Sequence, residues 1–261
     1  MALVTDNATR YLNRGAWGHG LATVTTPDPN DDTDPVMLDV WYPHPVLGDE
    51  TGPHAPVGFE APTVLRHAVQ CDPVRGVETE VIFTTSNLAE PPLDIADVYL
   101  RLHLLSNRLV RPGEVNLEGM EKLLPLVVWT DVGPCVPEGF EHTAYRIRMD
   151  QGHTVTVNGI SQIPRMLDYV VPADIEVIDA DAVRLGAPLA PGTAVRYGGQ
   201  LEANSGTESG AIVTEHIPAG TIFSGPLTAG TATGSGILHD DGGSVQVASN
   251  LHDDGAAHAA G

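Results

Sequence analysis

The chain has 261 residues, of which 42% are hydrophobic and 5% aromatic, and it contains 28 glycines and 21 prolines. This composition excludes a long helical bundle or coiled coil and favours a strand-rich protein with tight corners. The formal net charge of -21 excludes a surface built for nucleic acid and disfavours an acidic membrane surface. The sequence has no apolar run long enough for a transmembrane helix and no secretory signal pattern at its start. We therefore expect a cytoplasmic protein with no nucleic-acid or membrane partner.

Residues 1–150 predict an N-terminal α/β domain. Apolar residues spaced three and four apart over residues 97–110 predict a helix that ends before Pro112, and a second helix is expected over residues 117–126. His103 lies within the first helix, where a core or interface position is commoner than a catalytic one. Strands are expected at residues 21–25, 36–42, 77–85 and 126–130, the first two joined as a hairpin.

Beyond about residue 150 the sequence repeats every six residues. A period of six fits neither a helix nor an alternating strand, but it fits one flat side of a triangular coil. It predicts a hexapeptide-repeat parallel β-helix with aliphatic side chains pointing to the axis; a chance run of valines in a β-sandwich is the alternative. Aliphatic residues fill seven of the eight positions in the series: Val171, Val177, Val183, Leu189, Val195, Leu201, Thr207 and Val213.

The aliphatic series stops after Val213. We therefore expect a mainly β domain, the β-helix, over residues 151–238 and an acidic, glycine-rich, disordered tail over residues 239–261. Two His-Asp-Asp-Gly elements, at residues 239–242 and 252–255, contain metal-ligating residue types, but their context favours disorder. Because roughly three coils leave flat faces exposed, cyclic oligomerisation is expected.

Several strings in the chain resemble the actinobacterial form of the tetrahydrodipicolinate N-succinyltransferase family. The resemblance implies an N-terminal α/β domain, a left-handed β-helix and a trimer with reacting groups between neighbouring β-helices. It also implies succinyl transfer from succinyl-CoA to the amine of ring-opened tetrahydrodipicolinate, in lysine and diaminopimelate biosynthesis. The strings keep their order and approximate spacing, and they are residues 40–43, 99–106, 127–130, 133–135, 164–172, 179–188 and 190–193.

The chain departs from the family's catalytic string at three consecutive residues. Thr214 stands where the family has its catalytic Glu, Glu215 replaces a Gly and His216 replaces an Arg. We assign catalysis to Thr214 and Glu215, and substrate or coenzyme binding to His216 and to Asn204, which matches the family's Asn-x-Gly-Thr. Since neighbouring strand residues point to opposite faces, Glu215 should replace the missing Glu only through a bulge. His216 could supply a proton-transfer group, although a solvent-exposed strand histidine is the commoner case.

The metal position of the family is only half matched. Asp181 matches the family's metal-binding Asp, but Gly198 matches the Glu that accompanies it. One carboxylate from each subunit predicts at most a weak Mg²⁺ site on the trimer axis. A capping or solvent-facing role for Asp181 is the alternative.

The predicted function is that of a diverged, C-terminally shortened family member with weak or lost catalysis, using succinyl-CoA as co-substrate where it is active. It is expected to form a homotrimer or a mixed trimer with a full-length paralogue. The alternative is a non-catalytic paralogue that acts as a scaffold or regulatory partner of an intact trimeric enzyme. The family match supports the first function, whereas Thr214 in place of Glu supports the second.

Overall fold

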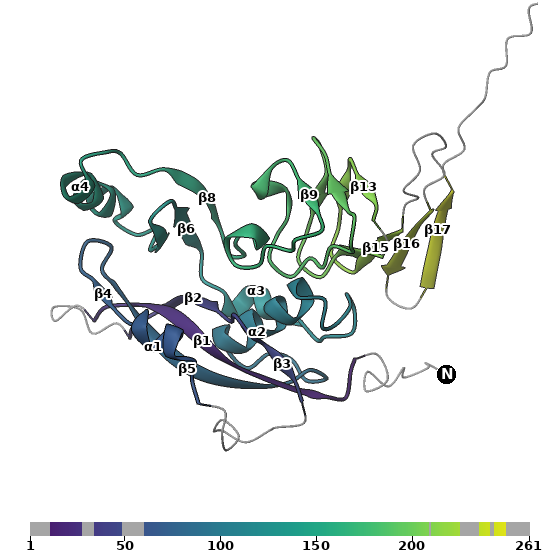
Figure 1. Cartoon of the computed structure of the whole chain (residues 1–261), viewed down its shortest axis with the longest axis horizontal. Helices are drawn as coiled ribbons and strands as arrows, with labels where there is room; N and C mark the ends of the chain where they lie inside the picture. The colour runs from purple at the N-terminus through teal and green to yellow at the C-terminus, as the bar shows by residue number, and fades with distance from the viewer. Residues whose placement is uncertain are drawn as a thin grey trace, which may run out of the picture.

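The structure is a computed structural model in which an N-terminal sheet and a stack of parallel coils lie on either side of a central helix (Figure 1). No helix in the described part of the chain is long and apolar enough to cross a membrane. The described residues are 11–27, 34–48, 60–208, 210–224, 235–240 and 243–248. For the last two of these ranges, the structure describes the strands but not the side chains.

An antiparallel sheet forms most of the N-terminal half. Its strand order is β2-β1-β5-β4, with β3 also paired to β1. The sheet confirms the hairpin predicted from residues 21–25 and 36–42 and the strand predicted at 77–85. The short helix α1 (Thr63–His67) precedes β4. The strands are β1 (Gly15–Thr25), β2 (Met37–Trp41), β3 (Val46–Leu47), β4 (Cys71–Asp72) and β5 (Val77–Asn87).

One face of this sheet packs against α2 (Ile95–Ser106). Asp94 caps the helix by accepting a hydrogen bond from the Asp97 amide, and almost every side chain of α2 is buried. Gly18 of β1 allows this close packing, because a Cβ there would lie 3.3 Å from a methyl group of Leu100 in α2. The helix stops at Ser106, earlier than the predicted residue 110, and Arg108 adopts a positive φ of 60°.

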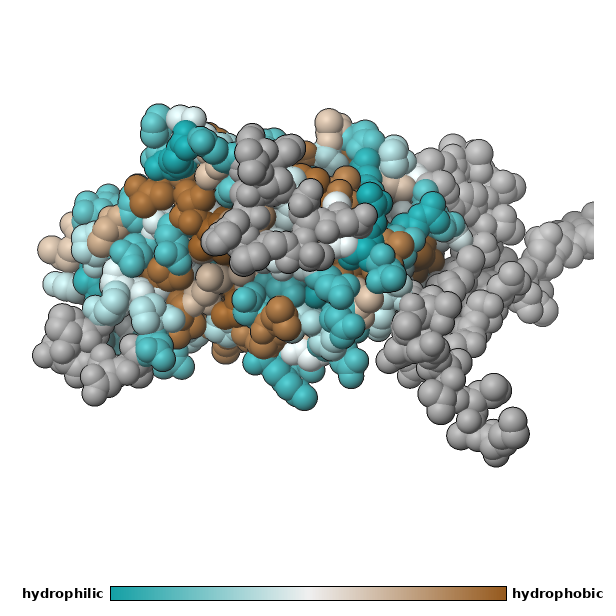
Figure 2. All heavy atoms as spheres, turned by 90° about the horizontal axis from the view of Figure 1, so that it is seen from below, coloured by the Kyte–Doolittle hydropathy of each residue, from teal (hydrophilic) through white to brown (hydrophobic). Residues whose placement is uncertain are grey.

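The opposite face of the sheet carries a small aromatic cluster. The rings of Trp17 and His19 lie 6.0 and 5.1 Å from the ring of Phe83. Figure 2 looks at the molecule from this side and shows hydrophobic and polar residues interspersed over it.

A second, three-stranded sheet follows, with the order β7-β6-β8. Its centre is β6 (Val127–Thr130), as predicted, flanked by β7 (Gly133–Cys135) and β8 (Val157–Ser161). Helix α4 (Phe140–Gln151), which was not predicted, packs against this sheet. Helix α3 (Met120–Leu123) is shorter than the predicted 117–126 and packs beside α2.

The coils confirm the six-residue period. Parallel pairing joins β9 (Glu176–Val177) to β10 (Ala194–Val195) and β10 to β13 (Ile212–Val213), one coil of 18 residues per step. Val171 departs from the prediction at 74% exposed, because parallel pairing begins only at β9. The inward side chains that are at most 1% exposed are Val183, Leu189, Val195, Leu201 and Val213.

The next coil is shorter by two residues. The corner between β10 and β11 (Gln200–Leu201) holds four residues, whereas the corner between β13 and β14 (His216–Ile217) holds two. Leu201 therefore pairs with Ile217, and the buried column continues at Ile217, out of phase with the period of six. The buried column of the coils thus extends one inward position, Ile217, beyond Val213, where the six-residue series ends in the sequence.

The coils are closed by strands of the opposite direction. β15 (Thr221–Ser224) pairs in parallel with β12 (Gly206–Thr207), and antiparallel with β16 (Ser235–Asp240), which pairs with β17 (Gly243–Ala248). The tail predicted at residues 239–261 therefore contains β17 and the end of β16, and its other residues, including the second His-Asp-Asp-Gly element, lie outside the described residues. The domain boundaries at 150 and 238 stay predictions.

The coils pack directly on α2. Leu185 and Ala203 belong to the same buried cluster as the helix, and the Gly186 amide donates to the Ser106 hydroxyl at 2.8 Å. At Gly186, where φ is +94°, a Cβ would lie 2.6 Å from a methyl group of Leu102. Glycine is needed there for both the left-handed backbone and the close approach.

Candidate functional site

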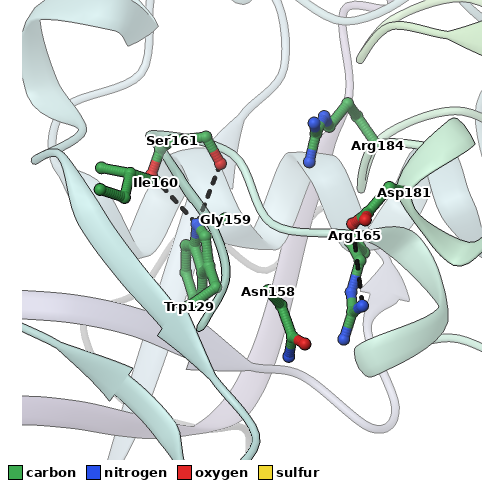
Figure 3. Close-up of a pocket in the computed structure, with 8 residues that line it drawn as sticks. All are labelled: Trp129, Asn158, Gly159, Ile160, Ser161, Arg165, Asp181 and Arg184. Carbon is green, nitrogen blue, oxygen red and sulfur yellow. Dashed lines mark hydrogen bonds and ion pairs between the residues drawn. The ribbon is translucent and has the colours of Figure 1, made fainter. Parts of the chain in front are cut away.

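A pocket of about 240 Å³ lies between the β6–β8 sheet and the first coil (Figure 3). Trp129 forms one side and is fixed by hydrogen bonds from its indole Nε1 to the Ser161 carbonyl oxygen and hydroxyl, at 3.1 and 3.0 Å. Arg184 and Asp181 lie on the other side in Figure 3. The lining residues are Trp129, Asn158, Gly159, Ile160, Ser161, Arg165, Asp181 and Arg184.

Backbone pairing brings the two arginines together from distant parts of the chain. Arg165 and Arg184 form an antiparallel bridge, flanked by a hydrogen bond from the Met166 amide to the Val183 carbonyl at 2.8 Å. Met166 and Val183 are fully buried, so their neighbours Arg165 and Arg184 point outward by strand alternation. The hydrophobic core of the coil therefore positions both guanidinium groups at the pocket.

The two arginines differ in what they contact. Arg165 donates two hydrogen bonds of 2.9 Å to Asp168, and these bonds raise the pKa of its guanidinium above the ordinary value. Its Nη1 also lies 3.7 Å from Asp181. Arg184 has no ion pair within the described residues, so its donors can bind a ligand. A guanidinium binds carboxylate and phosphate groups, each of which can accept two parallel hydrogen bonds from it.

The predicted catalytic residues occupy the short corner of the next coil. Thr214 and Glu215 are exposed and form the whole corner between β13 and β14. Neither residue lies in a strand, so strand alternation does not determine how Glu215 is oriented relative to Thr214. The Glu215 carbonyl accepts a hydrogen bond of 3.1 Å from the Gln200 amide, which ties the corner to the rung below.

His216 is paired with a carboxylate that the sequence did not indicate. Its Nε2 lies 3.2 Å from an oxygen of Glu202, and the two side chains are 52% and 49% exposed. Strand register places this pair on the same side of the coil as Arg184. Val183, Leu201 and Ile217 stack on three successive rungs, so Arg184 and Glu202 follow inward residues on adjacent rungs.

Comparison with known proteins now identifies the family. A sequence profile described as "Tetrahydrodipicolinate N-succinyltransferase middle" matches residues 124–165. A Salinispora tropica 2,3,4,5-tetrahydropyridine-2,6-dicarboxylate N-succinyltransferase is 42% identical over 80% of this chain and 64% of that protein. The chain belongs to the tetrahydrodipicolinate N-succinyltransferase family. A Pseudomonas aeruginosa protein of the same name is 33% identical over 74% of this chain and 60% of that protein. The chain thus spans less than two thirds of these relatives.

A solved structure shares the fold of this chain. It comes from Campylobacter jejuni and is described as a 2,3,4,5-tetrahydropyridine-2-carboxylate N-succinyltransferase. It aligns with a TM-score of 0.61 over 88% of this chain and 72% of that chain, at 19% identity. At that identity the likeness supports the fold and says nothing of individual site residues.

Asn204 has a structural role within this fold. Its backbone adopts φ of 61°, and its side-chain oxygen accepts a hydrogen bond of 2.9 Å from the Gly113 amide. The backbone amide of Asn204 donates a hydrogen bond to the Gly186 carbonyl, and its backbone carbonyl accepts one from the Gly220 amide. These contacts fix the loop after α2 on the coils. The predicted role of Asn204 in binding substrate or coenzyme stays a prediction.

The described residues do not support the Mg²⁺ site predicted at Asp181. This carboxylate is exposed and lies beside the Arg165 guanidinium, which competes with a cation. No group of three or more His, Cys, Asp or Glu side chains suited to a metal occurs in the described ranges. Gly198, which the resemblance matches to the family's second carboxylate, has φ of +87°, and a Cβ there would lie 3.1 Å from the Thr214 carbonyl oxygen.

Three charged residues of the site were not predicted: Arg165, Arg184 and Glu202. A signal for two of them was present, because Arg184 follows the inward Val183, and Glu202 follows the inward Leu201, in the repeat itself. A residue directly after an inward position must face outward on the flat side of a coil. Arg165 lies outside the repeat, so only the pairing of its segment with the first coil reveals it.

Proposed function

We propose that the chain is an N-acyltransferase that moves a succinyl group from succinyl-CoA to the amine of a small dicarboxylic acid, in lysine and diaminopimelate biosynthesis. The relatives' names supply the substrate class, 2,3,4,5-tetrahydropyridine-2,6-dicarboxylate. The observation that carries the proposal is the unpaired Arg184 guanidinium at a pocket on the same side of the coils as His216 and Glu202.

The size of the pocket limits what it can hold. At about 240 Å³ it is smaller than the roughly 300–1,000 Å³ of sites for drug-sized ligands. It suits one end of a small dicarboxylate, with a carboxylate on Arg184, and leaves the coenzyme on the outer face of the coils. The amine then attacks the thioester carbon, the C–N bond forms and the C–S bond breaks.

We further propose that the coils are left-handed and assemble as a trimer, either of identical chains or with a full-length paralogue. Apolar side chains that are exposed on the coils support an assembly: Ile178 is 40%, Ile212 47% and Tyr197 81% exposed. A neighbouring coil would cover these side chains and complete the coenzyme site. Sedimentation at micromolar concentration tests this, and a stable monomer would remove the shared site.

Catalysis is proposed to be slow. Thr214 replaces the family's Glu, and a threonine hydroxyl has no base character near neutral pH without an activating partner. Unless another residue takes over the proton transfer, loss of acid–base assistance costs about 10²–10⁴ in rate. The same observation favours the second candidate function, a non-catalytic paralogue that serves as scaffold or regulatory partner of an intact enzyme.

A thiol-release assay with succinyl-CoA separates the two functions. The enzyme releases coenzyme thiol only when the tetrahydropyridine dicarboxylate is present, at a rate proportional to protein concentration. A non-catalytic partner releases none, but it co-migrates with a full-length relative in size-exclusion chromatography.

Arg184 is tested by a matched pair of variants. Arg184→Gln should weaken binding of heptanedioate, which has the seven-carbon backbone of the opened ring, by at least about tenfold, since a hydrogen bond to a charged group contributes about 1.5–3 kcal/mol. Arg148→Gln, on the exposed surface of α4, is the control and should bind like the parent chain. Equal affinity of all three proteins in calorimetry would remove Arg184 from the site.

A further inference from the structure

We infer that His216 and Glu202 form the proton-transfer pair of this chain, with the imidazole taking the proton that the attacking amine loses. This inference rests on the proposed acyl transfer. It departs from the carboxylate that the family string would place at residue 214 and assigns the task to a neighbouring rung.

The geometry of the pair fits a base and its orienting carboxylate. A carboxylate oxygen accepts, so with Nε2 only 3.2 Å from Glu202 the hydrogen of the neutral ring resides on Nε2. Nδ1 then keeps its lone pair free to accept a proton. The Glu202 charge stabilises the imidazolium that results, and imidazole is the side chain whose charge changes nearest to neutral pH.

The position of the pair fits a substrate anchored by Arg184. Rungs of a parallel β-helix are about 4.8 Å apart, so His216 lies two rungs, or about 10 Å, from the rung of Arg184. A seven-carbon dicarboxylate held by a long arginine side chain can span that distance. Glu202, on the rung between them, pairs with His216, and no Arg184–Glu202 ion pair occurs in the described part of the chain.

The other groups on this side of the coils fit the role less well. The Thr214 hydroxyl has no hydrogen-bonded base within the described part of the chain, and Asp181 is next to the Arg165 cation. Glu215 is an exposed corner carboxylate for which the described residues provide no ion-pair partner. Among the described residues on this side of the coils, only His216 is an imidazole that a carboxylate orients.

The step balances without a further reactant. The amine nitrogen bonds to the thioester carbon while its proton passes to Nδ1 of His216. The C–S bond then breaks, the coenzyme thiolate leaves, and the imidazolium returns its proton to the thiolate or to solvent. An amide and a thiol are the products, and nothing is oxidised or reduced.

The test is the pH profile of kcat for thiol release by the full chain and three variants. His216→Gln should lower kcat about 100-fold or more and remove the acidic limb of the profile. Glu202→Gln should lower kcat with the acidic limb still present, because the imidazole loses the carboxylate that orients its ring. His142→Gln, an exposed histidine of α4 paired with Glu141, is the control and should leave both kcat and profile unchanged.

Two further readings keep the inference separate from folding and from the proposed function. Arg184→Gln should raise KM with the acidic limb in place, and added imidazole should restore turnover to His216→Gly. A His216→Gln protein that folds and keeps both kcat and the acidic limb would overturn the proton-transfer pair while leaving acyl transfer intact. Absence of amine-dependent thiol release from the unmodified chain would overturn the acyl transfer itself, and the pair with it.

Discussion

The buried histidine of α2 makes the stability of the fold depend on pH in a predictable direction. His103 is fully buried, and its Nδ1 lies 2.8 Å from the Tyr99 carbonyl oxygen, which only accepts, so Nδ1 carries the hydrogen. Its Nε2 accepts from the Tyr42 amide at 3.3 Å, and the ring of Tyr169 lies edge-on at 5.6 Å. A second ring proton therefore has no acceptor. Burial lowers the pKa of His103 to about 4, and the Tyr99 hydrogen bond opposes the shift only in part.

The sign follows from proton counting. Between the ordinary pKa of about 6.5 and the folded pKa, the unfolded chain binds a proton at His103 that the folded chain excludes. The free energy of unfolding therefore falls as pH falls, by about 1.4 kcal/mol between pH 7.5 and pH 5.5 and by about 3 kcal/mol once the pH is below 4. Burial raises the pKa of nearby Asp39, so that group acts in the opposite direction.

Urea unfolding of the chain and of His103→Asn at both pH values isolates the histidine. Asparagine can still donate to the Tyr99 carbonyl but does not titrate, so the pH dependence of the variant should be smaller by about 1.4 kcal/mol. His142→Asn, at an exposed position of α4, should keep the parent's pH dependence. Identical pH dependence in the chain and in His103→Asn would refute the assignment of a neutral, buried imidazole.

Three further changes test the packing. Leu189→Asp buries an unpaired carboxylate at the axis of the coils and should leave no soluble folded protein, whereas Leu189→Ala should cost about 2–5 kcal/mol in urea unfolding; a soluble, folded Leu189→Asp protein would contradict the core assignment. Arg101→Met leaves the buried carboxylate of Asp97 without its partner and should lower the free energy of unfolding in guanidinium by about 3–5 kcal/mol. A decrease of no more than about 0.5 kcal/mol would count against a buried ion pair. Gly186→Ala should lower Tm more than Gly152→Ala, because both residues have positive φ but only the first would place a methyl group 2.6 Å from a leucine of α2; equal shifts would show that this contact relaxes freely.

The β-helix could be predicted from the sequence because each coil repeats the same requirement. The inward side chain on each side of a coil must be aliphatic, so Val183, Leu189 and Val195 meet the same local requirement on three successive sides. The rule fails where a corner changes length. With two residues in place of four between β13 and β14, the inward position moves to Ile217, and counting by six misses it.

Other parts of the structure leave weaker traces in the sequence. Helix α4 buries only Thr143 and Ile147, so it has no continuous apolar stripe to detect. The pocket depends on the bridge between Arg165 and Arg184, which lie in segments joined only by tertiary pairing. No local period encodes such a pairing. The family resemblance includes both segments, residues 164–172 and 179–188, but it does not show that they pair with each other.

The coils separate the residues that hold the fold from the residues available for chemistry. An inward position such as Leu201 is fixed by packing, and a change there costs stability at once. The outward residues that follow, such as Arg184 and Glu202, contact solvent or ligand, so the stack tolerates their replacement. Thr214 can therefore stand in the place of a catalytic carboxylate with the corner and its backbone bond to the rung below intact. The proton-transfer role that we propose for His216 needs no rearrangement of the coil, because the rungs already hold outward side chains about 4.8 Å apart along this face.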